Sequence, residues 1–142
     1  RVAANCGAGG FADCVLANAA ACVELPDGMT DIEAAAFQVA YGTSHLALDY
    51  KARLRPGERL LVLGAAGGVG LTAVEIGKLM GAEVIAVARG ADRLARAKDA
   101  GADHLIDSET ADIREAVLAE TTPPMEFMHG ALRRRAAGGA GR

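Results

Sequence analysis

One stretch constrains the fold more than any other: residues 60–71, with the sequence LLVLGAAGGVGL. An apolar run typical of a buried strand is followed by a glycine-rich turn and then by an apolar segment with helical periodicity. Glycine at positions 64, 67, 68 and 70 permits positive φ and lets the backbone approach a ligand without an intervening Cβ. Free N–H groups at a helix start favour an anion such as pyrophosphate. The stretch predicts a phosphate-binding turn, with a turn that serves packing alone as the alternative.

A second strand supports the phosphate-binding interpretation. Residues 83–89, EVIAVAR, follow after a helix-length gap, as a βαβ unit requires. The glycines can be written Gly64-x-x-Gly67-x-x-Gly70, or as the dinucleotide-binding pattern G-x-G-x-x-G with Ala65 in place of the first glycine. Either spacing places a strand, a turn and a helix in the order that dinucleotide binding needs.

The sequence resembles the zinc-independent quinone oxidoreductases of the medium-chain dehydrogenase/reductase superfamily, over roughly residues 9–119. This resemblance implies the first half of an α/β, Rossmann-type parallel sheet, preceded by a remnant of a GroES-like β domain. The matching segments are GAAGGVG followed by LTAVEIGKLMGAEVIAVA, and also GGFADCVLA (9–17), LPDGMTDIEAAAF (25–37), VAYGTSHLAL (39–48), RPGERLLVLGAAGGVG (55–70) and AKDAGADHLID (97–107).

Composition limits the classes of partner. The chain has 142 residues, of which 51% are hydrophobic, enough for one domain with a buried core. A net charge of −3 and the lack of a basic patch argue against nucleic acid, and no apolar run approaches the roughly 20 residues of a membrane span. The chain starts at Arg1 with no charged-then-apolar leader, so we expect a piece of a longer cytoplasmic protein. The resemblance implies a homodimer for the intact protein.

The cysteines give no metal-binding pattern. Cys6, Cys14 and Cys22 are spaced eight apart, unlike the close pairs of a zinc site or an even disulfide set. The three histidines are isolated in sequence and are interpreted as surface or packing residues. We therefore predict reduced thiols and no metal, so that elemental analysis finds no tightly held zinc.

Residues 1–28 form the predicted GroES-like remnant, with short strands at 11–17 and 21–25 joined by a turn at 18–20. Residues 29–58 form predicted linking helices. Thr30 is a good N-cap with Glu33 three residues later, so a helix should begin at Asp31. Gly42 is expected to interrupt it before a second helical segment at 43–51. The family resemblance places Tyr41 and Thr43 near the nicotinamide, with helix packing or capping as the alternative for each.

Residues 59–120 alternate strand and helix and form the predicted NADP(H)-binding region. Apolar strands covered on both faces are typical of half of a doubly wound parallel sheet. The predicted elements are strands at 59–63, 83–88 and 103–106 and helices at 68–80, 91–100 and 110–120.

The pattern fails in residues 121–142. This segment contains Pro123-Pro124 and four arginines against a single Glu126. No strand is predicted here, and the composition favours a disordered tail, or an out-of-frame or alternative terminus, in place of the strand that the family would continue with. A basic tail that touches nucleic acid is a weaker alternative.

The end of the second strand indicates the coenzyme. An NAD enzyme has an acid here for the ribose hydroxyl, whereas this chain has Ala88-Arg89-Gly90. A guanidinium can bind a 2′-phosphate bidentately, and Arg93 follows at the position where the family often has a phosphate-binding lysine. Ser108 departs from the tyrosine usual in the family, and a solvated Arg89 is the alternative. We predict NADPH as the cofactor, bound by Tyr41, Thr43, Ala66, Gly67, Gly68, Val69, Gly70, Arg89 and Arg93.

The resemblance implies an NADPH-dependent oxidoreductase that transfers hydride to a quinone or an activated alkene such as an enone. No catalytic acid or base is assigned. Two alternatives stay open: a truncated, non-catalytic nucleotide-binding fragment, and an enoyl-thioester reductase domain of a multienzyme. Since the second half of the sheet is missing, we expect this chain alone to reduce quinones poorly.

Overall fold

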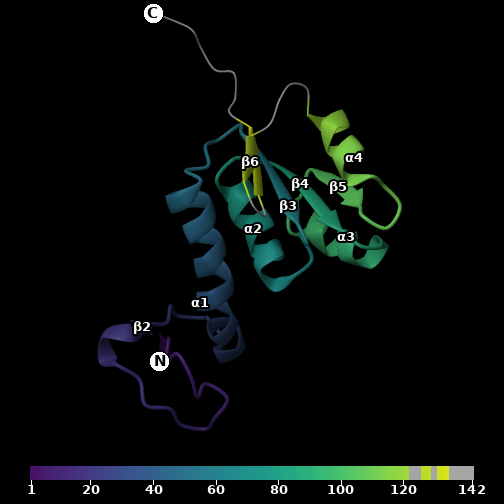
Figure 1. Cartoon of the computed structure of the whole chain (residues 1–142). Coiled ribbons are helices and arrows are strands. Elements are labelled where there is room, and N and C mark those ends of the chain that lie inside the picture. Colours follow the sequence, from purple (N-terminus) through teal and green to yellow (C-terminus); the bar gives the residue numbers. More distant parts are fainter. Residues whose placement is uncertain (122–125, 129–130, 135–142) are drawn as a thin grey trace, which may run out of the picture.

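A mixed five-stranded sheet organises the molecule (Figure 1). The computed structural model describes residues 1–121, 126–128 and 131–134. The strand order is β5-β4-β3-β7-β6, in which β3, β4 and β5 are parallel and β7 is antiparallel to both of its neighbours. The elements of this body are β3 (Arg59–Leu63), α2 (Gly68–Leu79), β4 (Glu83–Ala88), α3 (Ala91–Asp99), β5 (His104–Asp107), α4 (Ile113–Glu120), β6 (Glu126–Met128) and β7 (Ala131–Arg134).

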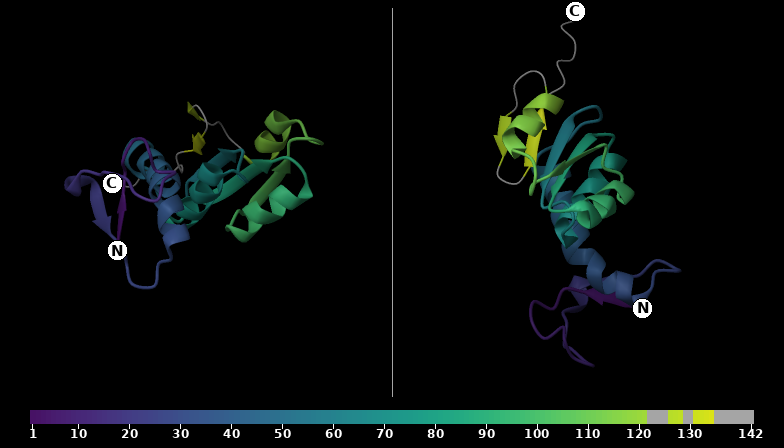
Figure 2. Two further views of the ribbon diagram at one scale, coloured as in Figure 1. Left: turned by 90° about the horizontal axis from the view of Figure 1, so that it is seen from below. Right: turned by 90° about the vertical axis from the view of Figure 1, so that its right-hand side faces the viewer.

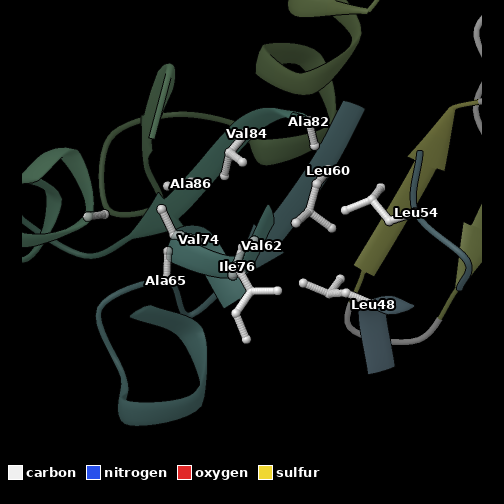
Figure 3. Close-up of a cluster of buried hydrophobic side chains, with 11 residues drawn as sticks. Leu48, Leu54, Leu60, Val62, Ala65, Val74, Ile76, Ala82, Val84 and Ala86 are labelled. Atoms are coloured by element: carbon white, nitrogen blue, oxygen red, sulfur yellow. The ribbon is translucent and has the colours of Figure 1, made fainter. Parts of the chain in front are cut away.

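Successive residues of β3 and β4 enter different hydrophobic clusters, as the two-residue period of a strand requires. Leu60 and Val62 belong to one cluster and Leu61 to the other. The first cluster takes Val74 from α2 and Ala97 from α3, and Figure 3 shows Leu48 and Leu54 lying opposite its β3 side chains. The second cluster takes Val117 from α4.

Helices therefore cover both faces of the parallel strands (Figure 2). The α/β Rossmann-type fold predicted from the sequence is confirmed, and the residue ranges of β3 and β4 agree with the prediction. Later boundaries shift slightly. Helix α4 begins at Ile113, not at residue 110, because the carboxylate of Asp112 accepts a hydrogen bond from the Glu115 N–H at 3.0 Å and caps the helix there.

The first part of the chain forms a separate small sheet beyond the start of α1 (Asp31–His45), away from the central sheet (Figure 1). Strand β1 (Val2–Ala4) pairs antiparallel with β2 (Cys22–Glu24), which follows a short 3-10 turn, η1 (Ala19–Ala21). The strand predicted at 11–17 is wrong, whereas β2 agrees with the strand predicted at 21–25. The apolar side chains of residues 11–17 have no protein surface to pack against: Phe11 and Leu16 are 110% and 99% exposed. Without burial, alternation alone does not hold a strand.

Helix α1 (Asp31–His45) begins as predicted. Thr30 and Glu33 form the reciprocal capping box, with the Glu33 N–H donating to Thr30 Oγ1 at 3.2 Å. The predicted interruption at Gly42 is wrong, because α1 runs through it and continues into a π-helix, η2 (Leu46–Lys51). A glycine inside a helix costs only about 1 kcal/mol relative to alanine, which the packing of α1 on α2 offsets. None of the helices in the described residues is long and apolar enough to cross a membrane.

Three strands occur where none was predicted: β1 in the first part of the chain, and β6 and β7 after residue 120. β6 and β7 pair antiparallel, and β7 pairs with β3 from Arg59 to Val62. The prediction of no strand after residue 120 is therefore wrong. The physical reason is that β3 would otherwise present an unpaired edge, and a short antiparallel hairpin supplies partners without a crossover helix. The prediction of a disordered tail also covers residues 122–125, 129–130 and 135–142, and these lie outside the described residues.

Candidate functional site

The glycine turn closes tightly at the carboxyl end of β3. Gly64 has φ +68°, and its carbonyl oxygen accepts the N–H of Gly67 at 3.0 Å. The Ala65 N–H donates to the Val87 carbonyl oxygen at 3.0 Å, which ties the turn to β4. A Cβ on Gly70 would overlap the Gly64 carbonyl oxygen and lie 2.9 Å from Ala65 Cα. Glycine is thus required at 64 for conformation and at 70 for space.

The start of α2 is open to an anion. Gly67 is the N-cap and supplies no side-chain hydrogen bond to the helix. The first N–H groups of a helix lack intrahelical acceptors, so those of Gly68, Val69 and Gly70 can donate outward. Together with the positive end of the helix dipole, they make this turn suitable for a pyrophosphate.

Two cavities meet at the turn, and Leu63, Gly64 and Gly67 line both. One has a volume of about 640 Å³ and extends over Ala66 toward Arg89 and Arg93. The other has a volume of about 460 Å³ and extends past Val69 and Gly70 toward Thr43. An elongated ligand with phosphates in the middle would fit such a pair of cavities.

Three arginines line the larger cavity: Arg89 at the end of β4, and Arg93 and Arg96 on α3. All three are exposed, and none forms an ion pair or side-chain hydrogen bond with another described residue. Arg89 and Arg93 were predicted from the sequence. Arg96 was missed, although its spacing of three residues from Arg93 signals the same helix face.

Asp107 joins the loops that follow β4 and β5. Its Oδ1 accepts the N–H groups of Gly90 at 3.1 Å and Glu109 at 3.0 Å. These two backbone hydrogen bonds, with that from Glu109 the larger effect, lower the pKa of the Asp107 carboxyl below its ordinary value of 3.8. The adjacent Ser108 N–H donates to the Ala88 carbonyl oxygen at 3.0 Å. Asp107 therefore positions the turn that carries Arg89.

The Asp107 carboxylate predicts a measurable acid sensitivity. Because its pKa is lowered on folding, it stabilises the fold above its unfolded pKa and loses this contribution as the pH falls through its folded pKa. Asp107→Asn should therefore show a smaller loss of unfolding free energy than the native chain between about pH 5 and about pH 2.5. Urea denaturation across this range measures the difference. The control is Asp99→Asn, an exposed acid at the end of α3; identical pH slopes for the native chain and Asp107→Asn would contradict the assignment.

Tyr41 and Thr43 lie on the same helix but differ in surroundings. Thr43 lines the smaller cavity, and its hydroxyl donates to the Val39 carbonyl oxygen at 2.6 Å. Tyr41 lines neither cavity: its hydroxyl donates to Glu75 on α2, which raises the Tyr41 pKa, and its ring stacks on Phe37 at 4.6 Å. The surroundings of Tyr41 are those of helix packing, and the coenzyme contact of both residues stays a prediction.

A buried pair of hydroxyls that sequence reasoning missed holds α1 against the start of α2. Ser44 and Thr72 are 2% and 6% exposed, and their side-chain oxygens lie 2.8 Å apart. Ser44 Oγ also donates to the Val69 carbonyl oxygen at 2.9 Å. Small polar residues inside amphipathic helices give little signal in a sequence, because the same residues occur on exposed faces.

No group of three or more metal-ligating side chains gathers among the residues with described positions. Cys6, Cys14 and Cys22 are free thiols in the structure, and Cys14 is exposed. His104, at the amino end of β5 and thus at the other end of the parallel strands from the glycine turn, lies between two carboxylates, with Nε2 2.8 Å from Glu83 and Nδ1 3.0 Å from Glu120. The absence of a metal requirement stays a prediction.

Comparison with known proteins agrees with this geometry. Residues 68–128 match a family model described as zinc-binding dehydrogenase. The quinone oxidoreductase from Thermus thermophilus, solved alone and with NADPH, is similar with a TM-score of 0.75 and 36% identity, over 83% of this chain and 40% of that one. The CurK enoyl reductase is similar with a TM-score of 0.65 and 34% identity, over 70% of this chain and 30% of that one.

Among curated proteins, a mycocerosic acid synthase-like polyketide synthase from Mycolicibacterium smegmatis is 37% identical over 98 residues. These residues are 69% of this chain and 5% of that protein. The chain thus spans less than half the length of each of these three relatives.

The sheet, the glycine turn and the open start of α2 define a Rossmann-type α/β protein. With the family match to residues 68–128 and quinone oxidoreductases among its structural neighbours, the chain belongs to the medium-chain dehydrogenase/reductase superfamily. The resemblance recognised in the sequence is confirmed.

Proposed function

We propose that this chain is the coenzyme-binding part of an NADPH-dependent oxidoreductase of quinone oxidoreductase type. One observation carries the proposal: the cavity lined by Arg89 and Arg93 continues into the glycine turn, where Ala66 and Gly67 also line it. A ligand that places a pyrophosphate at the turn can reach these guanidinium groups with the phosphate on its adenine ribose. NADPH has this phosphate and NADH lacks it.

Each predicted residue has a role in this proposal. The N–H groups of Gly68, Val69 and Gly70 would bind the pyrophosphate, with Ala66 and Gly67 beside it, and Arg89 and Arg93 would bind the 2′-phosphate. Thr43 would lie beside the nicotinamide in the smaller, mostly apolar cavity, and Tyr41 would act through the packing of α1 on α2. The bound coenzyme supplies the hydride, and the chain's own residues supply orientation and exclude water. The acceptor is a quinone or an activated alkene such as an enone.

A second candidate is an enoyl-thioester reductase domain of a multienzyme. The similarity to a polyketide synthase and to the CurK enoyl reductase favours it. Both candidates use the same coenzyme site and differ in the acceptor, so activity with a simple quinone against activity with an enoyl thioester separates them. A non-catalytic nucleotide-binding fragment would bind the coenzyme and reduce neither.

Calorimetric titration of the 142-residue chain with NADPH and with NADH tests the coenzyme assignment. We expect NADPH to bind at least about tenfold more tightly, because each charge-assisted hydrogen bond contributes about 1.5–3 kcal/mol before solvent screening. Equal affinity for the two coenzymes, or no binding of either, would reject the proposal.

The setting of the intact protein is part of the same proposal. We propose a cytoplasmic homodimer that acts on a small molecule, with no nucleic-acid or membrane partner. The net charge of −3 supports the exclusion of nucleic acid.

A further inference from the structure

The larger cavity has more positive charge than the two predicted arginines supply. Arg96 lines it as well, and no carboxylate does. Arg93 and Arg96 are three residues apart on α3, so their Cα atoms are separated by about 4.5 Å along the axis and lie on one face. With Arg89, which directly follows β4, three guanidinium groups line one cavity.

None of these arginines is neutralised within the fold. As described above, each lacks an ion-pair partner among the described residues. The carboxylate of Asp107 is committed to the N–H groups of Gly90 and Glu109. One acid lies at the rim: Glu109 Oε2 is 3.8 Å from the position that a Cβ on Gly90 would occupy.

The charge of the site suits one phosphate monoester. The three arginines that line the cavity outnumber the two carboxylates beside Gly90, those of Glu109 and Asp107, so the site keeps a net positive charge. A phosphate monoester has a charge of about −1.5 to −2 at pH 7 and three strong acceptor oxygens. Three guanidinium groups can together donate to all three terminal oxygens, with more charge-assisted hydrogen bonds than two groups supply.

We propose that Arg96 is a third phosphate-binding residue, so that the adenosine 2′-phosphate is held by three guanidinium groups. This inference rests on the proposed function, since it concerns the same coenzyme. Arg96 would bind only the 2′-phosphate, because it lies one helical turn beyond Arg93 and away from the glycine turn. Its contribution should be absent for a ligand without that phosphate.

Two small ligands test this on the full chain: 2′-phosphoadenosine 5′-phosphate and 5′-AMP, which differ only in the 2′-phosphate. Arg96→Ala should weaken binding of the former about fivefold, a value discounted for the exposure of the side chain, and leave 5′-AMP unchanged. Arg96→Lys should restore part of the loss, because lysine keeps the charge and lacks the bidentate fork. Lys98→Ala is the matched control, an exposed cation on α3 outside the cavity. Calorimetry gives all the affinities, and circular dichroism confirms that each variant folds.

The outcomes separate the two proposals. If the 2′-phosphate strengthens binding, and Arg89→Ala and Arg93→Ala weaken it while Arg96→Ala does not, the role of Arg96 is rejected and the proposed function stands. If Arg96→Ala and Lys98→Ala have equal effects, the loss reflects general charge and the role of Arg96 is likewise rejected. If the native chain binds both ligands equally or binds neither, both proposals fail.

Discussion

Gly70→Ala is expected to lower the free energy of unfolding by about 1–3 kcal/mol, the usual cost of overpacking, and to abolish coenzyme binding. The new Cβ would overlap the Gly64 carbonyl oxygen and lie 2.9 Å from Ala65 Cα. Both are backbone atoms, so no side-chain rotation relieves the overlap. Relief requires the turn to open, which moves the N–H groups that face the anion site. Urea denaturation and an NADPH titration measure the two effects.

Gly68→Ala is a matched control two residues earlier in the same helix. Apart from its chain neighbours and the backbone of its own helix, nothing lies within 4 Å of a Cβ built there. Alanine in a helix is favoured over glycine by about 1 kcal/mol, so this variant should be as stable as the native chain or more stable. Equal stability of the two variants would mean that the turn accommodates a side chain at 70, and would contradict the argument.

The elements predicted well are those in which local pattern and long-range packing agree. β3 and β4 are nearly continuous apolar runs. Side chains on both faces of these strands are buried in the fold, so successive apolar residues are buried whichever face they point to. The capping box at Thr30 is a local interaction over three residues, and sequence alone specifies it.

The failures have a different origin, because they depend on partners distant in the chain. The strand predicted at 11–17 has β-favouring residues and lacks a surface to cover, whereas β7 forms on the free edge of β3 despite an unfavourable composition. Gly42 stays helical because α1 packs along α2, which a single-residue propensity does not include.

The same distinction applies to the site. The glycines and Arg89 follow directly from β3 and β4, so the positions of these strands fix them in the turn and at the strand end. Tyr41 lies two residues before the cavity-lining Thr43, about 200° around the helix axis, and whether its side chain faces the coenzyme or α2 depends on the rotation of α1. That rotation is set by the buried contact of Ser44 with Thr72, which no local pattern encodes.

Arg89→Ala should weaken NADPH binding about tenfold or more and leave NADH nearly unaffected. Arg89 lies at the end of β4, where an acid would bind an unphosphorylated ribose, and it lines the larger cavity without an ion-pair partner among the described residues. Its guanidinium would donate charge-assisted hydrogen bonds of about 1.5–3 kcal/mol to the 2′-phosphate, and tenfold corresponds to about 1.4 kcal/mol. Because the expected change is in the ratio of the two affinities, a general loss of structure, which would weaken both coenzymes together, is distinguishable from it.

Arg114→Ala controls for the removal of an exposed arginine, since Arg114 lies on α4 and outside the cavity. Titrating both coenzymes by calorimetry into the native chain and the two variants gives three affinity ratios. Only the ratio for Arg89→Ala should fall, and the fall should shrink as salt is raised, because an exposed ionic contact is screened. An unchanged ratio would mean that Arg89 is a solvated residue at a strand end, and coenzyme choice would then depend on Arg93 and Arg96 on the following helix.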